Sequence, residues 1–426
     1  MTPKGGATKT YNELMKTDYL VVGGGLVGLA TAWHLARTKR GARIRLLEQA
    51  SRVTAGNSGK SAALYRTLFS SRTSRLLATS SATYYETIAA EIALVPRGYL
   101  WAFDARDWVT AASLAAELVA ASPGTDILGP AELGRFLAPA ALRRGPAEAT
   151  GAIFGARAGS LSATALGAHY ARLFVEAGGE ILIGRRAGPP LPDAPADAWW
   201  EAKHFSGLVD SSGERHEAGC IVAAAGCWLQ DLLGPAGIAT GVYPKKRQLF
   251  AFRLPDENAI FAPGLAPERQ PVVILPGSGI YLKPVPGRGL LIAGRADDLG
   301  RAFELPYEPV ASAEPSYFRA AMEPSIREAF PALDSANASP LEIANAWAGH
   351  YDYYWPDRNP VVERRGDLVW VGGSSGSGIM KADAIGRIAA AAAAGDPSAE
   401  LADGEVFPVS ALSLRERAVD AEALVI

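Results

Sequence analysis

Residues 18–48, DYLVVGGGLVGLATAWHLARTKRGARIRLLE, decide the fold of this 426-residue chain. An apolar run predicts a strand, a glycine-rich turn follows, and a periodic apolar segment predicts a helix that leads into a second strand. Gly23, Gly25 and Gly28 form the pattern G-x-G-x-x-G between that strand and that helix. In a dinucleotide-binding βαβ unit the first glycine permits a tight turn, the second lets the backbone approach a pyrophosphate, and the third lets the helix pack closely on the strand.

An acidic residue follows at the position that a ribose requires. Glu48 ends the second predicted strand, 20 residues after Gly28, where its carboxylate can accept both ribose hydroxyls. The acid disfavours a 2′-phosphate, which leaves NAD or FAD. The next stretch, RVTAGNSGKSAALYR at residues 52–66, is small, polar and rich in glycine. NAD-binding chains usually continue directly into another strand here, whereas a loop of hydroxyls and amides suits a longer flavin dinucleotide. The sequence therefore favours FAD.

A second glycine-rich loop, GGSSGSGIMKADAIGR at residues 372–387, lies almost 350 residues downstream of the first. It follows the strand-like run DLVWV and leads into an alanine-rich segment that predicts a helix to Ala394, with Gly395 as its cap. Two nucleotides in two domains would explain a pair of such loops. A single long cofactor held from both ends of the chain would explain it equally well.

The composition is that of a soluble globular protein. Lys and Arg number 42 and Asp and Glu number 44, a balance that disfavours a nucleic-acid partner. The spacing of Cys220 and Cys227 fits neither a zinc site nor a disulfide framework, so both are expected to be core thiols in a reducing compartment. The polar first residues lack a secretory signal, and no apolar run reaches the roughly 18–20 residues of a membrane span. We expect a cytoplasmic location, with peripheral attachment to a membrane left open.

The predicted elements are interleaved along the chain. Strand–turn–helix units at its beginning, middle and end enclose two segments of short β-type runs separated by Pro and Gly. We expect an α/β fold, α+β overall, in which a Rossmann-like nucleotide-binding domain is assembled from residues 17–93, 151–238 and 346–396. A mainly antiparallel β domain for the substrate would be inserted as residues 94–150 and 239–345. Residues 1–16 and 397–426 would form tails.

The chain resembles the FAD-dependent D-amino acid oxidase superfamily, in particular its glycine oxidase, sarcosine oxidase and D-amino acid dehydrogenase branch. The resemblance spans nearly the whole chain and rests on the motifs VVGGGLVGLATAWHLA, LLEQASRVTAGNSGKSAA, GARAGSLSATALGAHYARLFVEAGGEI, IVAAAGCWL, YPKKRQLFAF, WAGHYDYYWPDRNPVV and VGGSSGSGIMKADAIGRIAA. It implies that the first loop binds the pyrophosphate of FAD and that the last loop reaches the isoalloxazine end of the same molecule. One cofactor would then explain both loops.

The resemblance also implies which residues contact FAD. Both cysteines lie outside the positions through which some members attach flavin covalently, so noncovalent binding is expected. Lys381 and the first N–H groups of the last helix would stabilise the negative charge of the reduced flavin. The expected cofactor-binding residues are Gly23, Gly25, Leu26, Val27, Gly28, Glu48, Gln49, Asn57, Ser58, Gly59, Lys60, Ser61, Ala62, Gly226, Gly376, Ser377, Gly378, Ile379, Met380 and Lys381.

On the substrate side, Tyr281 and Arg247 match a tyrosine and a basic residue of such proteins. Amino acid-oxidising relatives often carry WAGLR, whose Arg binds the substrate carboxylate, but His350 and Tyr351 follow WAG here. The carboxylate could instead be held by Arg247, Arg66 or Arg295, or the substrate could be other than a simple free amino acid. The aromatic residues around His350 and Tyr351 would suit a larger or N-substituted amine, although they could equally be core residues.

The resemblance implies oxidation of a C–N bond in a D-amino acid, a proline-like secondary amine or an N-methylglycine-like compound, by hydride transfer to flavin N5. Sarcosine oxidase-like relatives carry an oxygen-activating Lys where Leu291 and Ile292 stand here. A dehydrogenase that passes electrons to a quinone, a dye or a partner flavoprotein is therefore favoured over an oxidase. A 2-hydroxyacid dehydrogenase with His350 as the base, and a non-catalytic assembly factor for respiratory complexes, remain as alternatives.

Overall fold

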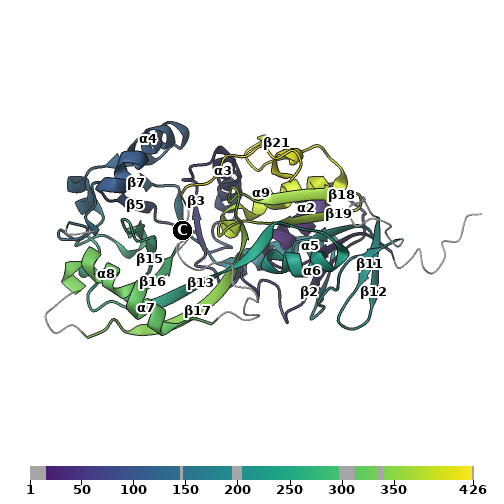
Figure 1. The fold of residues 1–426 in the computed structure, drawn as a ribbon, viewed down its shortest axis with the longest axis horizontal. Coiled ribbons are helices and arrows are strands. Elements are labelled where there is room, and N and C mark those ends of the chain that lie inside the picture. The colour runs from purple at the N-terminus through teal and green to yellow at the C-terminus, as the bar shows by residue number, and fades with distance from the viewer. Residues whose placement is uncertain (1–15, 144–146, 194–203, 297–311, 334–338, 425–426) are drawn as a thin grey trace, which may run out of the picture.

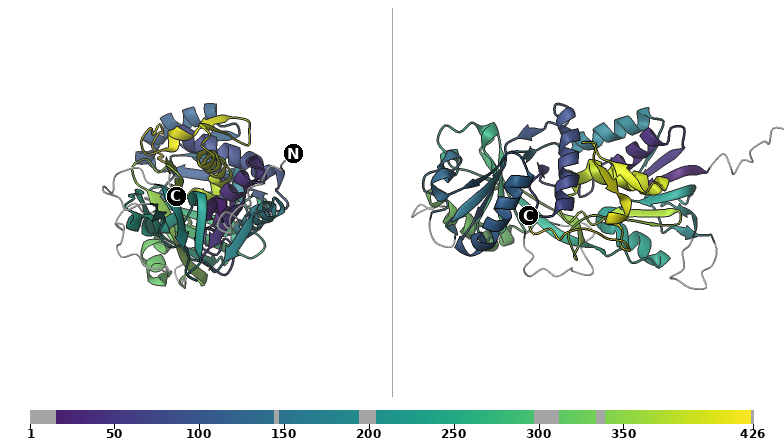
Figure 2. Two further views of the ribbon diagram at one scale, coloured as in Figure 1. Left: turned by 90° about the vertical axis from the view of Figure 1, so that its right-hand side faces the viewer. Right: turned by 90° about the horizontal axis from the view of Figure 1, so that it is seen from above.

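The computed structural model describes residues 16–143, 147–193, 204–296, 312–333 and 339–424. The chain forms two lobes, each built around one large sheet (Figures 1 and 2). The tail expected over residues 1–16 lies outside the described residues except for Lys16. Among the residues that the structure describes, no helix combines the length and the apolar character that crossing a membrane requires.

The first sheet is a parallel nucleotide-binding sheet with antiparallel additions. Its parallel strands lie in the order β19-β12-β1-β2-β9, while β18 pairs antiparallel with β19 and the hairpin strands β11 and β10 extend from β12. Parallel strands buried on both faces carry continuous apolar runs, as LVV and LVWV do here. The bounds are β1 Thr17–Val22, β2 Ile44–Glu48, β9 Glu180–Ile183, β10 Leu191–Pro192, β11 Phe205–Val209, β12 Arg215–Ala223, β18 Val361–Arg365 and β19 Leu368–Gly372.

Helices cover this sheet, and two of them cross at very short range. A Cβ on Gly386 would lie 2.6 Å from the Cβ of Ala30, so the glycine allows α9 to pack against α2. Gly395 ends α9 with a φ of +81°, as the sequence predicted. His34 on α2 bonds to Asp383 on α9 inside this interface, at 2.8 Å. The helices are α2 Leu26–Thr38, α3 Arg72–Thr87, α5 Ala163–Glu176, α6 Leu229–Leu233 and α9 Gly378–Ala394.

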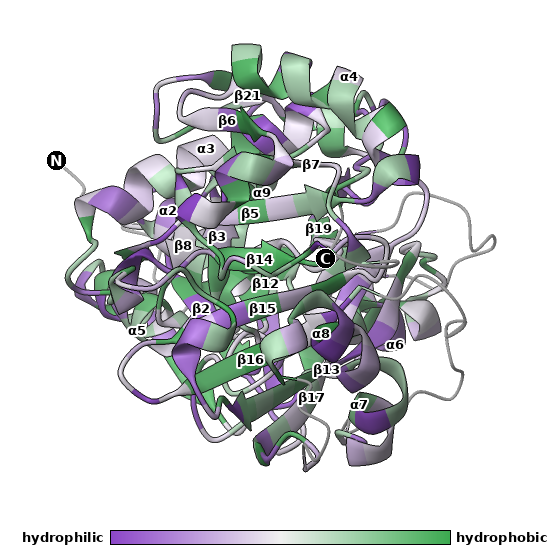
Figure 3. Cartoon of the chain, turned by 90° about the vertical axis from the view of Figure 1, so that its left-hand side faces the viewer, coloured by the Kyte–Doolittle hydropathy of each residue, from purple (hydrophilic) through white to green (hydrophobic). Residues whose placement is uncertain are grey.

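The second sheet is almost entirely antiparallel, in the order β17-β13-β16-β15-β14-β5-β7-β6, and among its described strands only β14 and β5 pair in parallel. Its strands carry many of the apolar residues seen in Figure 3. They are β5 Tyr99–Phe103, β6 Thr125–Leu128, β7 Gly151–Gly155, β13 Val242–Arg253, β14 Val272–Ile274, β15 Ile280–Val285, β16 Leu290–Arg295 and β17 Ile343–Tyr354. The helices near this sheet are α4 Ala105–Ala121, α7 Pro315–Ala321 and α8 Glu323–Ala329.

Short elements complete the fold. The strands β3 Leu64–Arg66, β4 Val95–Pro96 and β8 Ala158–Ser160 form a three-stranded sheet, and β20 Ser398–Glu400 pairs with β21 Val406–Pro408. The α/β fold class and the mainly antiparallel second sheet are confirmed. The strand pairing differs from the expected boundaries at residues 151 and 346, because β7 and all of β17 lie in the second sheet. As a division into domains, the expected boundaries stay a prediction.

Candidate functional site

A cavity of about 670 Å³ lies where the carboxyl ends of β1, β2, β12 and β19 meet the strands β13, β15 and β17. The carboxyl edge of a parallel sheet is where α/β folds bind nucleotides. Both glycine-rich loops contribute to its wall, as do the residues of β17 that follow the WAG motif. The two loops, far apart in sequence, therefore share one cavity.

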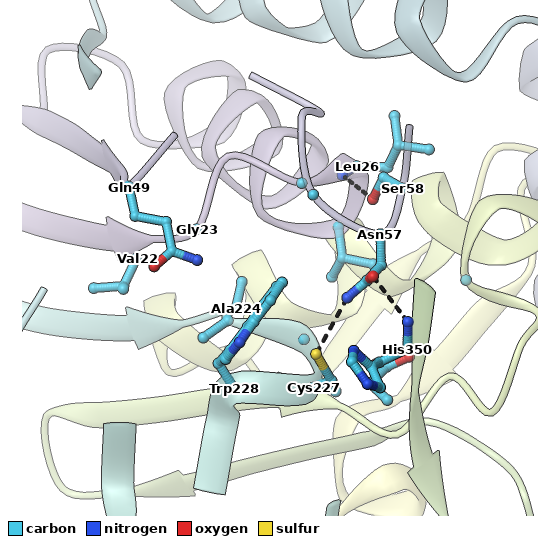
Figure 4. Close-up of a pocket in the computed structure, with 18 of the residues that line it drawn as sticks. Val22, Gly23, Leu26, Gln49, Asn57, Ser58, Ala224, Cys227, Trp228 and His350 are labelled. Carbon is cyan, nitrogen blue, oxygen red and sulfur yellow. Dashed lines mark hydrogen bonds between the residues drawn. The ribbon is translucent and has the colours of Figure 1, made fainter. Parts of the chain in front are cut away.

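The first glycine-rich turn has the geometry that its sequence predicted. Gly23 has a φ of +110°, and a Cβ there would lie 2.4 Å from the carbonyl oxygen of Ala224. A Cβ on Gly28 would lie 2.0 Å from the carbonyl oxygen of Gly23, so this glycine allows close packing and does not line the cavity. The Leu26 N–H donates to Ser58 Oγ at 3.2 Å (Figure 4). The beginning of α2 therefore faces the cavity, as phosphate binding requires, and the Ser58 hydroxyl lies at its first N–H group.

Glu48 is held in place by two backbone donors. Its Oε2 accepts the N–H of Gly24 and its Oε1 accepts that of Ala50, each at 2.7 Å. The side chain is buried and lines the cavity. A carboxylate can accept about four hydrogen bonds, so each oxygen retains acceptor capacity for a ribose hydroxyl.

The loop after β2 is fastened to the opposite wall of the cavity by Asn57. Its Oδ1 accepts the backbone N–H of His350 at 2.9 Å, and its Nδ2 donates to Cys227 Sγ at 3.2 Å (Figure 4). The Trp347 indole also donates to the carbonyl of Lys60, at 2.7 Å. A polar loop is thereby fixed against β17 and against the 3-10 helix η3 (Gly226–Trp228).

The last glycine-rich loop is fastened to β17 in the same way. Asp352 Oδ1 accepts the Ser374 hydroxyl at 2.5 Å, and its Oδ2 accepts the Ser374 N–H at 3.1 Å. Burial raises the pKa of Asp352 even though these hydrogen bonds oppose the shift. Gly376 has a φ of +90°, and a Cβ there would lie 2.3 Å from the ring of Tyr351. The glycine therefore allows Tyr351 to pack directly on the loop.

Most of the expected cofactor residues line this cavity, and five do not. Gly28, Gly59, Ser377, Met380 and Lys381 are absent from its wall. A Cβ on Gly59 would lie 2.3 Å from the carbonyl oxygen of Thr54, and Ser377 Oγ donates to the Ser374 carbonyl at 2.7 Å. The residues that do line it are Gly23, Gly25, Leu26, Val27, Glu48, Gln49, Asn57, Ser58, Lys60, Ser61, Ala62, Gly226, Gly376, Gly378 and Ile379.

Lys381 lies in the protein core between α9 and α3. Its ammonium donates to Ser74 Oγ at 2.8 Å and lies 4.4 Å from the centroid of the Phe69 ring. The side chain is completely buried, and this burial lowers its pKa to about 7. The expectation that Lys381 faces the flavin is not supported by this placement, because packing directs the side chain away from the cavity wall.

The four expected substrate-side residues, Arg247, Tyr281, His350 and Tyr351, all line the cavity. The Arg247 guanidinium lies 5.2 Å from the centroid of the Tyr351 ring. Burial raises the pKa of both tyrosines, so their hydroxyls are neutral hydrogen-bond donors at ordinary pH. The wall opposite the dinucleotide loops is therefore aromatic, with one arginine.

The other two candidate arginines serve the structure instead. Arg66 is fully buried and donates to the backbone carbonyls of Leu68 and Leu424. Arg295 donates to the carbonyls of Ser278 and Ala321, each at 3.0 Å. Neither lines the cavity, which leaves Arg247 as the one of the three that does.

Sequence reasoning missed several cavity residues. Cys227 and Trp228 reach the wall from η3, and Asp352 reaches it from β17. Burial raises the pKa of the Cys227 thiol, so it stays protonated. The quoted motifs IVAAAGCWL and WAGHYDYY contained these residues, but only the folded chain turns them towards the cavity.

A cluster of Asp210, Glu214 and His216 lies at one end of this region, with ligand-type atoms within 4.8 Å of one another. The guanidinium of Arg185 donates to Asp210 at 2.8 Å and to Glu214 at 3.1 Å. The positive charge of Arg185 therefore offsets the carboxylates of Asp210 and Glu214, in the place where a metal ion would otherwise do so. Arg185 and Asp210 also line the cavity.

The residues present fit FAD. Glu48 can hold a ribose, the beginning of α2 beside Ser58 can hold a pyrophosphate, and Gly376, Gly378 and Ile379 with Tyr281 and Tyr351 line the space beyond. Residues of both loops line this one cavity, which suits one long dinucleotide rather than two separate nucleotides. Noncovalent attachment agrees with the protonated state of Cys227 and stays a prediction.

Comparisons with known proteins agree with this geometry. A family model described as FAD dependent oxidoreductase, DAO, matches residues 18–392. The structure of L-proline dehydrogenase from P. horikoshii is similar, with a TM-score of 0.71 and 22% identity over 88% of this chain and 92% of that one. Glycine oxidase from Geobacillus kaustophilus has a TM-score of 0.70 and 20% identity, over 95% of this chain and 100% of that one. These two likenesses show the fold.

Curated relatives match a shorter part of the chain. FAD-dependent oxidoreductase domain-containing protein 1 of Xenopus laevis is 27% identical over 203 residues, which cover 44% of this chain and 37% of that protein. Its counterpart in Bos taurus is 28% identical over 207 residues, or 43% and 37%. The alignment thus spans little more than a third of these relatives. The family model, by contrast, covers most of the chain: the protein belongs to the DAO family of FAD-dependent oxidoreductases.

Proposed function

We propose that the protein oxidises the C–N bond of an amino acid or a secondary amine that carries a carboxylate. The observation that supports this most is Arg247, a buried arginine in the aromatic cavity wall beside Tyr351 and Tyr281. A guanidinium binds a carboxylate through two parallel hydrogen bonds, and the neighbouring tyrosine hydroxyls can donate to the same group. Arg247 would thus replace the arginine that WAGLR supplies in amino acid-oxidising relatives.

The chain's own residues would also prepare the amine. A C–N bond is oxidised from the neutral amine, because its nitrogen lone pair assists the loss of electrons from the adjacent carbon. The apolar wall and the positive charge of Arg247 lower the pKa of a bound ammonium, so the proton is lost to water before the oxidation. When bound, FAD supplies the acceptor for the two electrons. No strong base is required of the protein.

We propose a dehydrogenase, with a quinone or a partner flavoprotein as the electron acceptor. Leu291 and Ile292 occupy the positions where oxidase relatives carry a lysine. Lys283, however, pairs directly opposite Ile292, and its ammonium donates to the Ala62 carbonyl at 2.6 Å. A cation therefore lies near the cavity wall even though no lysine stands at positions 291 and 292. Exposure of the reduced protein to oxygen is the test that separates a dehydrogenase from an oxidase. A cytoplasmic location also stays a prediction.

The test is anaerobic reduction of the FAD-loaded protein by a panel of amines, D- and L-amino acids, N-methylglycine and 2-hydroxyacids. We expect loss of the visible flavin absorption with one class of carboxylate-bearing amine. Persistence of the reduced spectrum in air indicates a dehydrogenase, and rapid recovery an oxidase. Reduction by no candidate would contradict the proposal and favour a non-catalytic role.

Arg247→Met tests the carboxylate contact, with Arg253→Met on the same strand as the matched control. Arg253 is exposed and pairs with Glu342. Charge-assisted hydrogen bonds contribute about 1.5–3 kcal/mol, so Arg247→Met should raise the substrate Kd by roughly 10- to 100-fold while FAD is retained. An equal effect of both variants would contradict the assignment.

A 2-hydroxyacid dehydrogenase is the second candidate, and the position of His350 in the cavity wall favours it. Oxidation of a hydroxyl requires a base for its proton, and an imidazole can serve. His350→Ala should abolish turnover of hydroxyacids and leave turnover of amines. Loss of both in proportion would indicate that His350 shapes the wall only.

A further inference from the structure

The cavity wall that carries Tyr281 is one face of the second sheet, and a row of paired residues crosses four of its strands there (Figure 1). Tyr281 on β15 pairs with Gly294 on β16, which pairs with Leu249 on β13. Leu249 pairs in turn with Trp347 on β17. Directly paired residues project from the same face of a sheet, and Tyr281 and Leu249 both line the cavity. Position 294 is therefore a gap in the side chains of this wall.

The ring of Tyr281 fills that gap. A Cβ on Gly294 would lie 2.4 Å from Cζ, 2.5 Å from the hydroxyl oxygen and 2.6 Å from Cε1 of Tyr281. The three atoms nearest to that position thus all belong to the far end of one ring. The ring leans across β16 along the sheet instead of standing away from it. The φ of Gly294 is not positive, so the glycine is required for this close approach and not for its backbone conformation.

The second tyrosine of the wall, Tyr351, is seated on a glycine as well, since its ring lies over Gly376. Arg247 precedes Leu249 by two residues on β13, so it projects from the same face as the row, and it also lines the cavity. The space beside Arg247 is therefore bounded by two rings that lie against backbone. A larger residue under either ring would displace that ring from its place against the backbone.

We propose that Gly294 is a specificity-determining residue, which keeps room beside Arg247 for an amine that carries a ring or a branched group as well as a carboxylate. A Cβ projects perpendicular to a sheet, and the cavity lies on that side of β16. An alanine at position 294 would therefore push the ring of Tyr281 off the sheet and into this room. The substrate class rests on the proposed function, whereas the contact between Gly294 and Tyr281 does not.

The test titrates the FAD-loaded protein with acetate and with benzoate, which have no amine to oxidise, and follows the change in visible flavin absorption. We expect Gly294→Ala to raise the Kd of benzoate by roughly tenfold or more and that of acetate by about twofold at most, because overpacking excludes the larger ligand first. The matched control is Gly155→Ala on β7 of the same sheet, where a Cβ would make an ordinary contact with Leu68 at 3.4 Å. It should leave both constants unchanged.

Tyr281→Leu tests whether Gly294 acts through the ring, because a leucine has no ring end to place over position 294. Adding Gly294→Ala to Tyr281→Leu should change the ratio of the two Kd values by less than about twofold. This pair of variants keeps the proposal testable if Gly294→Ala alone does not fold, since the double variant contains no ring to displace.

Three results would overturn the proposal. The first is equal weakening of acetate and benzoate in Gly294→Ala, the second is a further loss of benzoate in the double variant, and the third is a wild type that does not bind benzoate. None of these results bears on whether an amine reduces the flavin, so failure of this inference and failure of the proposed function are distinguishable.

Discussion

Lys381→Met removes a lysine that is completely buried beside Ser74 and Phe69. Burial lowers the pKa of Lys381 to about 7, whereas the pKa of an unfolded lysine is about 10.4. Between these two values the unfolded chain binds one more proton than the folded chain. The free energy of unfolding therefore rises with pH in this window, by up to about 1.4 kcal/mol per pH unit, and falls again as the pH decreases towards 7.

From about pH 7.5 to about pH 9.5 the shift contributes about 2.5 kcal/mol to the wild-type rise, and Lys381→Met should lack this contribution. The assay is urea unfolding at saturating FAD across that range. Lys39→Met is the matched control, because Lys39 is a partly exposed lysine paired with Asp396. Other titrating groups, among them Lys283, are common to all three proteins and cancel in the comparison. Equal slopes in the wild type and in Lys381→Met would refute the reasoning.

Two further changes test the cavity itself. Gly23→Ala places a Cβ 2.4 Å from the Ala224 carbonyl oxygen at a φ of +110°, and we expect this variant to lose FAD on gel filtration. The control is Gly41→Ala, also at positive φ but with no atom within 4 Å of the new Cβ, which should retain FAD. Asn57→Ala removes the bonds to His350 and Cys227 and should weaken FAD binding by roughly tenfold in a fluorescence titration. Equal binding in Asn57→Ala and in the exposed-site control Asn258→Ala would contradict the fastening role.

The sequence by itself determined the nucleotide-binding unit. The role of Gly23 depends on its backbone conformation, and the role of Glu48 depends on its place at the end of a strand. Local spacing in the sequence predicts both features. Local signals also predicted the helix that ends at Gly395 and the antiparallel character of the second sheet. Gly and Pro turns and apolar periodicity act within a few residues, so they can be read from the sequence. The resemblance then supplied the single cofactor that explains both loops.

Only the tertiary structure decided which side chains reach the cavity. Helix α9 is buried on nearly all sides, so its sequence has no polar face to show that Lys381 points towards α3. The sequence offered three arginines for the carboxylate, of which the resemblance singled out Arg247, and packing turned Arg66 and Arg295 towards backbone carbonyls and Arg247 towards the cavity. The contacts of Lys381 with Ser74 and of Arg66 with Leu424 join segments 307 and 358 residues apart in the chain, which no local pattern encodes.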